Sequence, residues 1–217
     1  MNTPELPFSP ASERNKGPIL EALKRVLPRQ GAVLEIGSGT GQHVVHFGAC
    51  LPFLVWQPSD RTENLPGLRL RIQQEGSANI LPPIALDVLT AWPERDFAAI
   101  YSANTAHIMS WKAVCVMFWG VARQLLHSGV FCLYGPFNEN GAFTAASNAA
   151  FHEQLRSENL EMGLRDIAEL EKLAASQQLR LAKRFSLPAN NQLLVFDFAP
   201  EGKTSAWLRE TAHENRD

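Results

Sequence analysis

Three glycines, Gly37, Gly39 and Gly41, occupy every second position directly after the apolar stretch 32–36. Glycine packs no side chain and loses more backbone freedom on folding than other residues. A common reason to place several after a strand is that a ligand must approach the main chain closely. Glu35 stands two residues before the first glycine, which gives the spacing E-x-G-x-G-x-G. This spacing predicts a ligand-binding loop with a carboxylate beneath it.

Two classes of ligand compete for such a loop, dinucleotides and S-adenosylmethionine. The dinucleotide fingerprint is G-x-G-x-x-G, and here Gln42 stands where its last glycine would be. A carboxylate close to a pyrophosphate repels it, whereas S-adenosylmethionine carries an ammonium and a sulfonium and no phosphate. Glu35 and Gln42 therefore favour S-adenosylmethionine.

The elements that must position this loop alternate along the chain. Five apolar runs, separated by helical patterns and loops, predict parallel strands, because strands buried on both faces are continuously apolar. Two further runs, 179–187 and 192–198, flank the turn residues 188–191 and predict an antiparallel hairpin. The fold class expected is α/β, with a Rossmann-like, doubly wound sheet of seven strands that is mostly parallel and has one antiparallel strand from this hairpin. We expect the first helix to begin at Pro18 and the stretch 136–165 to form a lid.

Composition limits the partners and compartments. The chain has 217 residues and a net charge of −2 with both signs scattered, which predicts neither a nucleic-acid nor a membrane partner. Its three cysteines are far apart, as is typical of reduced thiols in a cytoplasmic protein. His43 and His46 lack a third ligand, so no metal site is expected. We expect an N-terminal segment over residues 1–17, one domain over 18–200 and a polar tail over 201–217.

The glycine loop, the acids after later strands and the hairpin together resemble the class I S-adenosylmethionine-dependent methyltransferases, in which the seventh strand lies antiparallel beside the fifth. More specifically, the strings SPASERNKGPIL, VLEIGSGTGQH, WQPSD and ALDV, and RD after LEMGL, are similar to the family called domain of unknown function 938. Animal members of that family are known as methyltransferase-like protein 26. The resemblance implies a methyltransferase-like domain whose cofactor is S-adenosyl-L-methionine, and it leaves the methyl acceptor open.

The resemblance also implies roles for individual residues. Asp60 would take both ribose hydroxyls, since a carboxylate accepts two hydrogen bonds; a turn or helix cap is the other explanation. Gln57 would take the ribose instead if the second strand ends early. Asp87 and Val88 would contact the adenine, unless Asp87 is an ordinary loop acid. The residues implied to hold the methionine part and the sugar edge form the loop: Glu35, Gly37, Ser38, Gly39 and Gly41.

Other positions are candidates for the reacting end of the site. Asn104 follows the fourth strand, where methyltransferases bring cofactor and acceptor together, and its amide can orient a reacting group. His107 is the candidate general base because imidazole titrates near neutral pH, with a capping or packing role as the alternative. Arg14 and Asn15 either fold over the cofactor or stay solvated. The residues expected to rim the acceptor pocket follow the fifth strand: Tyr134, Asn138 and Glu139.

The expected function follows from the needs of methyl transfer. Displacement at a sulfonium requires alignment of the acceptor and exclusion of water more than acid–base chemistry. The leading interpretation is a methyltransferase for a small-molecule acceptor, and the alternative is a non-catalytic cofactor-binding or scaffold protein on the same fold. Gln42 disfavours a nucleotide-linked oxidoreductase. The charge balance, and the lack of an N-P-P-Y-type motif after the fourth strand, disfavour a nucleic-acid methyltransferase. The oligomeric state is left open.

Overall fold

Seven strands form the main sheet of the computed structural model, which describes residues 5–200, and their order is β3-β2-β1-β4-β5-β9-β8. Strands β1 to β5 pair in parallel, whereas β9 is antiparallel to both β5 and β8. This arrangement confirms the expected fold class. Two short strands, β6 and β7, pair with the end of β5 in addition. The bounds are β1 Gly31–Ile36, β2 Leu54–Asp60, β3 Ile84–Ala85, β4 Phe97–Ala103, β5 Leu125–Glu139, β6 Ala142–Phe143, β7 Arg165–Asp166, β8 Leu179–Leu187 and β9 Asn191–Phe198.

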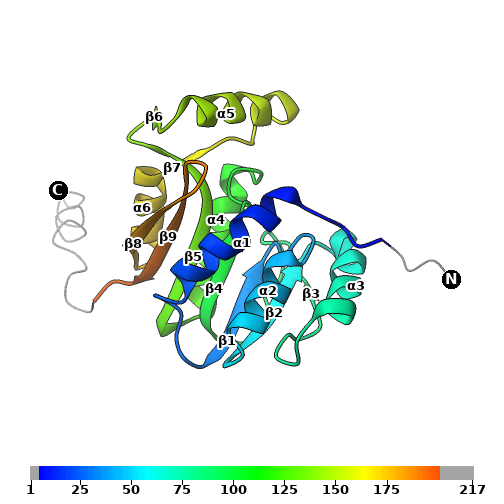
Figure 1. Ribbon diagram of the computed structural model, residues 1–217. Coiled ribbons are helices and arrows are strands. Elements are labelled where there is room, and N and C mark those ends of the chain that lie inside the picture. The colour runs from blue at the N-terminus through cyan, green and yellow to red at the C-terminus, as the bar shows by residue number, and fades with distance from the viewer. Residues whose placement is uncertain (1–4, 201–217) are drawn as a thin grey trace.

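Helices cover both faces of this sheet (Figure 1). Helices α1, α2 and α3 pack on one face, α4 and α6 pack on the other, and α5 lies beyond the ends of the strands. Among residues 5–200, no helix combines the length and the apolar character needed to cross a membrane. The bounds are α1 Pro10–Leu23, α2 Gln42–Cys50, the short 3-10 helix η1 Thr62–Asn64, α3 Leu65–Glu75, α4 Trp111–Gln124, α5 Ala146–Glu158 and α6 Ile167–Ser176.

Two layers of core hold the sheet between its helices. Val33 and Leu34 are neighbours in β1 and point to opposite faces of the sheet. Both are fully buried because helices cover each face. On the α4 face, the Phe118 ring meets Phe131 and Phe196 edge-on, with centroids 5.3 and 5.2 Å away. Burying each such side chain stabilises the fold by about 1.5–3 kcal/mol. This two-sided burial explains why the strands read as continuously apolar.

The prediction that the first helix begins at Pro18 is wrong, because α1 begins eight residues earlier. The Ser9 side chain caps the helix by accepting a hydrogen bond from the Ser12 N–H at 3.2 Å, and Pro10 follows in the first turn. Pro18 lies inside the helix. Helix α1 therefore crosses from the expected N-terminal segment into the domain and brings Arg14 and Asn15 with it.

The stretch 136–165 is more ordered than a long loop. Strand β5 continues to Glu139, β6 follows, and α5 supplies a helix of 13 residues. Residues of α5 line the cavity described below, so this part of the stretch forms a wall of the cavity, and the lid stays a prediction.

Candidate functional site

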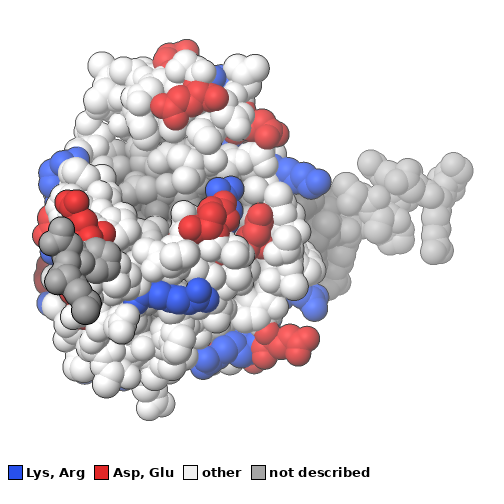
Figure 2. All heavy atoms as spheres, turned by 90° about the vertical axis from the view of Figure 1, so that its right-hand side faces the viewer, with Lys and Arg blue, Asp and Glu red and all other residues white. Residues whose placement is uncertain are grey.

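A cavity of about 1110 Å³ lies beyond the carboxyl ends of the central parallel strands. The strand order reverses between β1 and β4, and ligands of doubly wound sheets bind at this switch point. Loops after β1, β2, β3 and β4 supply one side of the wall, and α1, β5, α5 with the segment after it, and the turn between β8 and β9 supply most of the rest. Figure 2 shows a hollow whose border consists mostly of residues other than Lys, Arg, Asp and Glu. The geometry thus provides one large, mainly uncharged chamber.

The glycine loop adopts the backbone that its composition predicts. Gly37, Gly39 and Gly41 all have positive φ, of 73°, 53° and 78°. The N–H groups of Gly37 and Ser38 both donate to the Ser59 carbonyl, at 3.0 and 2.9 Å, so the loop turns across the end of β2. All of these loop residues except Gly41 line the cavity.

The three glycines meet different surroundings. A Cβ at Gly37 would lie 2.7 Å from Thr105 Cγ2, and one at Gly41 would lie 2.8 Å from Leu68 Cδ1. A Cβ at Gly39 would meet no heavy atom within 4 Å. Gly37 and Gly41 therefore serve packing, whereas Gly39 leaves open space at the cavity wall for a ligand.

Asp60 is the last residue of β2 and lines the cavity while only 6% exposed. Its Oδ2 accepts a hydrogen bond from the Gly39 N–H at 2.6 Å, so the carboxylate supports the glycine loop directly. Its Oδ1 accepts from the Arg61 N–H at 2.8 Å and from Asn64 Nδ2 at 2.7 Å. Since a carboxylate has about four lone-pair sites, it can hold this turn and still accept from a ligand.

Gln57, the alternative to Asp60, does not line the cavity, and its Nε2 donates to the Pro82 carbonyl at 2.8 Å. The strand does not end early, so the condition for using Gln57 is not met. Asp87 and Val88 both line the cavity directly after β3, as expected. The Asp87 Oδ1 also accepts from the Leu89 N–H at 2.9 Å, which shapes the loop.

Glu35 lies beneath the loop and is not part of the cavity lining. It is 2% exposed, and its Oε2 has no hydrogen-bond partner among the described residues. Burial raises the pKa of Glu35 to about 7; a hydrogen bond with Ser38 opposes this rise, and the charge of Asp60 adds to it. An unpaired buried carboxylate is costly, and the raised pKa means that the neutral acid is favoured here.

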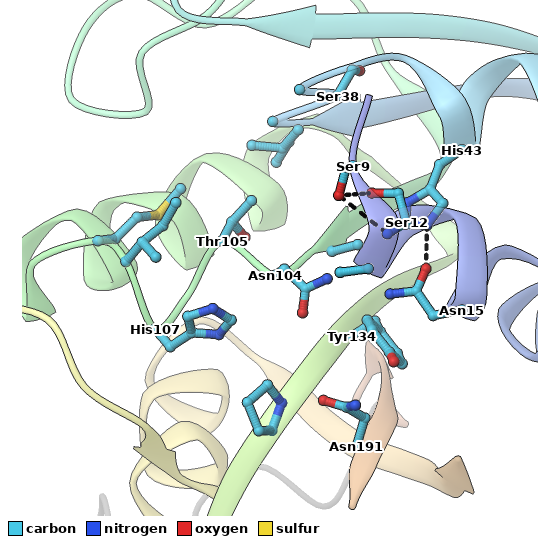
Figure 3. Close-up of a pocket in the computed structure, with 18 of the residues that line it drawn as sticks. Ser9, Ser12, Asn15, Ser38, His43, Asn104, Thr105, His107, Tyr134 and Asn191 are labelled. Carbon is cyan, nitrogen blue, oxygen red and sulfur yellow. Dashed lines mark hydrogen bonds between the residues drawn. The ribbon is translucent and has the colours of Figure 1, made fainter. Parts of the chain in front are cut away.

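Two candidates for the reacting end follow β4 and line the cavity, Asn104 and His107 (Figure 3). Asn104 has a φ of 56°, and its N–H donates to the Tyr134 carbonyl at 2.9 Å. Such a conformation strains a non-glycine residue, and it is typical of functional positions. His107 is 6% exposed, and its ring meets the Phe151 ring edge-on at 5.2 Å. Burial, and secondarily the charge of Arg165, lower the pKa of His107 to about 4, so the imidazole is neutral at pH 7.

Helix α1 places both Arg14 and Asn15 at the cavity. Asn15 Oδ1 accepts a hydrogen bond from His43 Nε2 at 2.7 Å (Figure 3). The other ring nitrogen of His43 lies 3.3 Å from the Tyr101 hydroxyl, and burial lowers the pKa of His43 to about 4. His43 is therefore a neutral link between helices. Among residues 5–200, no group of three or more His, Cys, Asp or Glu residues could hold a metal ion.

Of the three residues expected to rim the acceptor pocket, only Tyr134 lines the cavity. Asn138 and Glu139 lie elsewhere, because β5 continues through both and pairs there with β6 and β7. Glu139 forms an ion pair with Arg184, and its Oε1 accepts from Gln192 Nε2 at 3.0 Å. Glu139 borders a separate, shallower hollow of about 530 Å³. The expectation that these two residues share a pocket with Tyr134 is therefore wrong.

Several lining residues escaped the sequence analysis. They come from helices and turns whose approach to the sheet is a tertiary event. The S-P pair at 9–10 indicates a helix start and the string P-A-N-N at 188–191 indicates a turn, but neither shows that its element reaches the cavity. The main examples are Ser9, Ser12, Thr105, Asn148, Phe151, Met162 and Asn191.

Comparison with solved structures shows the same fold. The mitomycin 7-O-methyltransferase MmcR superposes with a TM-score of 0.75 at 14% identity, covering 87% of this chain and 54% of that one. CalO1, a methyltransferase in calicheamicin biosynthesis in its SAH-bound form, gives 0.71 at 18% identity, covering 87% and 55%. An O-methyltransferase family 2 protein from Planctomyces limnophilus in complex with apigenin gives 0.74 at 16% identity, covering 87% and 60%.

This chain thus spans little more than half the length of the proteins it superposes on. At these identities the likeness concerns the fold, which is methyltransferase-like. The sequence itself matches the family described as "Protein of unknown function (DUF938)" over residues 6–197, and the chain belongs to that family.

Proposed function

We propose that this protein binds S-adenosyl-L-methionine in the cavity and transfers its methyl group to a hydroxyl of a small, uncharged molecule. The observation that carries the proposal is the open space beside Gly39, which is flanked by Asp60 and followed along the wall by Asp87. Glycine adopts a φ of 53° without strain, whereas any other residue would be strained there and would place its Cβ in this open space.

The residues present fit the cofactor. The loop from Gly37 to Gly39 would hold the methionine part, with the buried carboxyl of Glu35 beneath it. Asp60 would accept from a ribose hydroxyl at its remaining lone-pair site, and Asp87 from the adenine amine. When bound, the sulfonium supplies an activated methyl group and a good leaving group.

The chain's own contribution is to orient the acceptor, exclude water and take up a proton. The Asn104 amide has no hydrogen-bond partner within the described part of the chain, so it is free to orient a hydroxyl. The neutral ring of His107 has a lone pair that can accept the hydroxyl proton. Helices α1 and α5 border the cavity and limit its access to water.

Among the described residues outside the loops assigned to the cofactor, Arg14 and Glu161 are the charged residues of the cavity lining, and the rest of that wall is uncharged, which supports an uncharged acceptor. Cavity residues contributed by α5 and by the turn between β8 and β9 are all uncharged: Ser147, Asn148, Phe151, Pro188, Ala189, Asn190 and Asn191. Placing an unpaired charge in such surroundings is costly. O-methyltransferases among the superposed structures, one of them bound to apigenin, support a hydroxyl acceptor. We also propose that this chain is related to animal methyltransferase-like protein 26 and that it acts in the cytoplasm.

The test separates binding from transfer. Calorimetry should detect binding of S-adenosylmethionine to the wild type, and labelled methyl transfer should be measured over a panel of neutral hydroxylated compounds. His107→Ala should keep the cofactor affinity and slow transfer by about 10²–10⁴-fold. His127→Ala is the matched control, because His127 is exposed and lies outside the cavity. A wild-type protein that does not bind the cofactor contradicts the proposal.

The alternative function is cofactor binding without methyl transfer. The lowered pKa of His107 favours it, because a weakly basic imidazole is a poor proton acceptor. Tight cofactor binding, with no transfer to any member of a broad acceptor panel, would decide for this alternative.

A further inference from the structure

Helix α1 is joined to the glycine loop by a set of buried side-chain hydrogen bonds. The helix borders the cavity through Ser9, Ser12 and Asn15, which Figure 3 shows on the side of the site opposite His107. A ligand that fills the cavity would touch both this helix and the loop, so the bonds that join the two bear on how the ligand is held.

Gln42 makes the first connection. It is the first residue of α2, it is 4% exposed, and it stands where a dinucleotide-binding loop would have its last glycine. Its Oε1 accepts from the Ser9 N–H at 2.6 Å and from the Thr40 hydroxyl at 2.9 Å. Its Nε2 donates to Glu13 Oε2 at 2.9 Å. One amide thus ties the N-terminus and first turn of α1 to the glycine loop.

Arg71 makes a second, independent connection from α3. It is 5% exposed, and its guanidinium donates to the Pro7 carbonyl and to the Thr40 carbonyl, each at 2.6 Å. Its remaining nitrogen pairs with Glu75 at 2.6 Å, which neutralises the buried charge. Arg71 therefore joins the segment leading into α1 to the same loop residue that Gln42 contacts.

We propose that Gln42 and Arg71 clamp α1 onto the glycine loop along one side of the cofactor cavity as a roof, so that loosening the clamp speeds the release of cofactor. This inference rests on the proposed function for the identity of the ligand. Both are positioning residues: they act through α1 and the loop, and neither lines the cavity.

Exchanging donor and acceptor across the Gln42–Glu13 contact tests the clamp. In Gln42→Glu two carboxylates face each other, whereas in the double variant Glu13→Gln/Gln42→Glu a donor again faces an acceptor, with the positions exchanged. Hydrogen exchange of the α1 amides should accelerate in Gln42→Glu without any cofactor present, and the double variant should restore it. Dissociation of S-adenosylhomocysteine should be about tenfold faster in Gln42→Glu and return toward wild type in the double variant.

Two further variants make the outcome decisive. Glu21→Gln removes an exposed ion pair with Lys24 on the same helix and should change neither measurement. Gln42→Ala replaces Gln42→Glu if the latter does not fold. If hydrogen exchange in α1 is unchanged in Gln42→Glu, Gln42 does not hold the helix and the clamp is refuted. If exchange is faster but ligand dissociation is unchanged, α1 does not slow ligand release and the roof is refuted. If the wild type does not bind S-adenosylhomocysteine, the proposed function fails, and the exchange data alone decide the clamp.

Discussion

Replacing Gly39 with alanine tests whether the open space beside this residue belongs to a ligand. The backbone has a φ of 53°, so the added Cβ costs about 1–2 kcal/mol through the left-handed conformation. The Cβ meets no heavy atom within 4 Å, so no clash adds to this cost. Thermal denaturation of the ligand-free protein should therefore show a fall in Tm of about 2–8 °C.

Cofactor affinity should fall as well, for a separate reason. The methyl group of Gly39→Ala occupies volume at the cavity wall, and overpacking by one methyl costs about 1–3 kcal/mol. Converted to affinity, this is roughly a five- to 150-fold increase in Kd for S-adenosylhomocysteine, which titration calorimetry resolves.

Gly141→Ala is the matched control. Gly141 has a φ of 79° and also meets nothing within 4 Å, but it lies between β5 and β6 outside the cavity. It should lose as much stability as Gly39→Ala and keep wild-type affinity. Equal affinities for the wild type and both variants would refute the assignment of the Gly39 space to the cofactor. Equal losses of affinity in Gly39→Ala and Gly141→Ala would show that backbone strain, and not occupied volume, is responsible.

Three further predictions concern other residues. Asp60→Asn should weaken S-adenosylhomocysteine binding about tenfold in calorimetry, because the one amide oxygen has two lone pairs while three protein donors and a ribose hydroxyl compete for it; unchanged affinity would contradict a ribose contact. The pKa of Glu35 is about 7 in the folded state, against 4.5 as its ordinary value, so its contribution to stability is lost as pH rises through this window. Urea denaturation should show Glu35→Gln gaining about 2–3 kcal/mol relative to the wild type between pH 4.5 and 8, and a pH-independent difference would exclude this cause. Ala189→Gly should raise the free energy of unfolding by about 0.5–1 kcal/mol, because Ala189 has a φ of 60°, and a lower Tm would show that the turn is not strained.

Much of the fold follows from local chemistry along the chain. The glycines of the loop adopt positive φ, which glycine tolerates because it has no Cβ. The alternation in 179–187, the turn residues and the following apolar run predict a hairpin, which pairs as β8 and β9. Asp166 caps α6 by accepting from the Ala168 N–H at 2.8 Å. Such features depend on neighbours in sequence, and a pattern can therefore show them.

The cofactor half of the candidate site was accessible for the same reason. Asp60, Asp87 and Asn104 each follow a parallel strand, and the carboxyl ends of parallel strands meet at one edge of the sheet. By contrast, Glu35 was expected among the contacts, and the loop covers it instead. Whether a residue beside a loop faces the ligand or the core depends on packing that no spacing encodes.

The fold class and the loop at the switch point can be predicted from the order of residues, because periodicity and glycine placement are local properties. The remaining walls of the cavity depend on how the elements pack in three dimensions. This packing carried β5 past Asn138 and Glu139, and it brought Asn148 of α5 and Asn191 of the hairpin to the cavity. It also closed the bonds from Gln42 to α1, across 29 and 33 residues of chain. Contacts between distant segments depend on how whole elements pack, and that is a property of the assembled core.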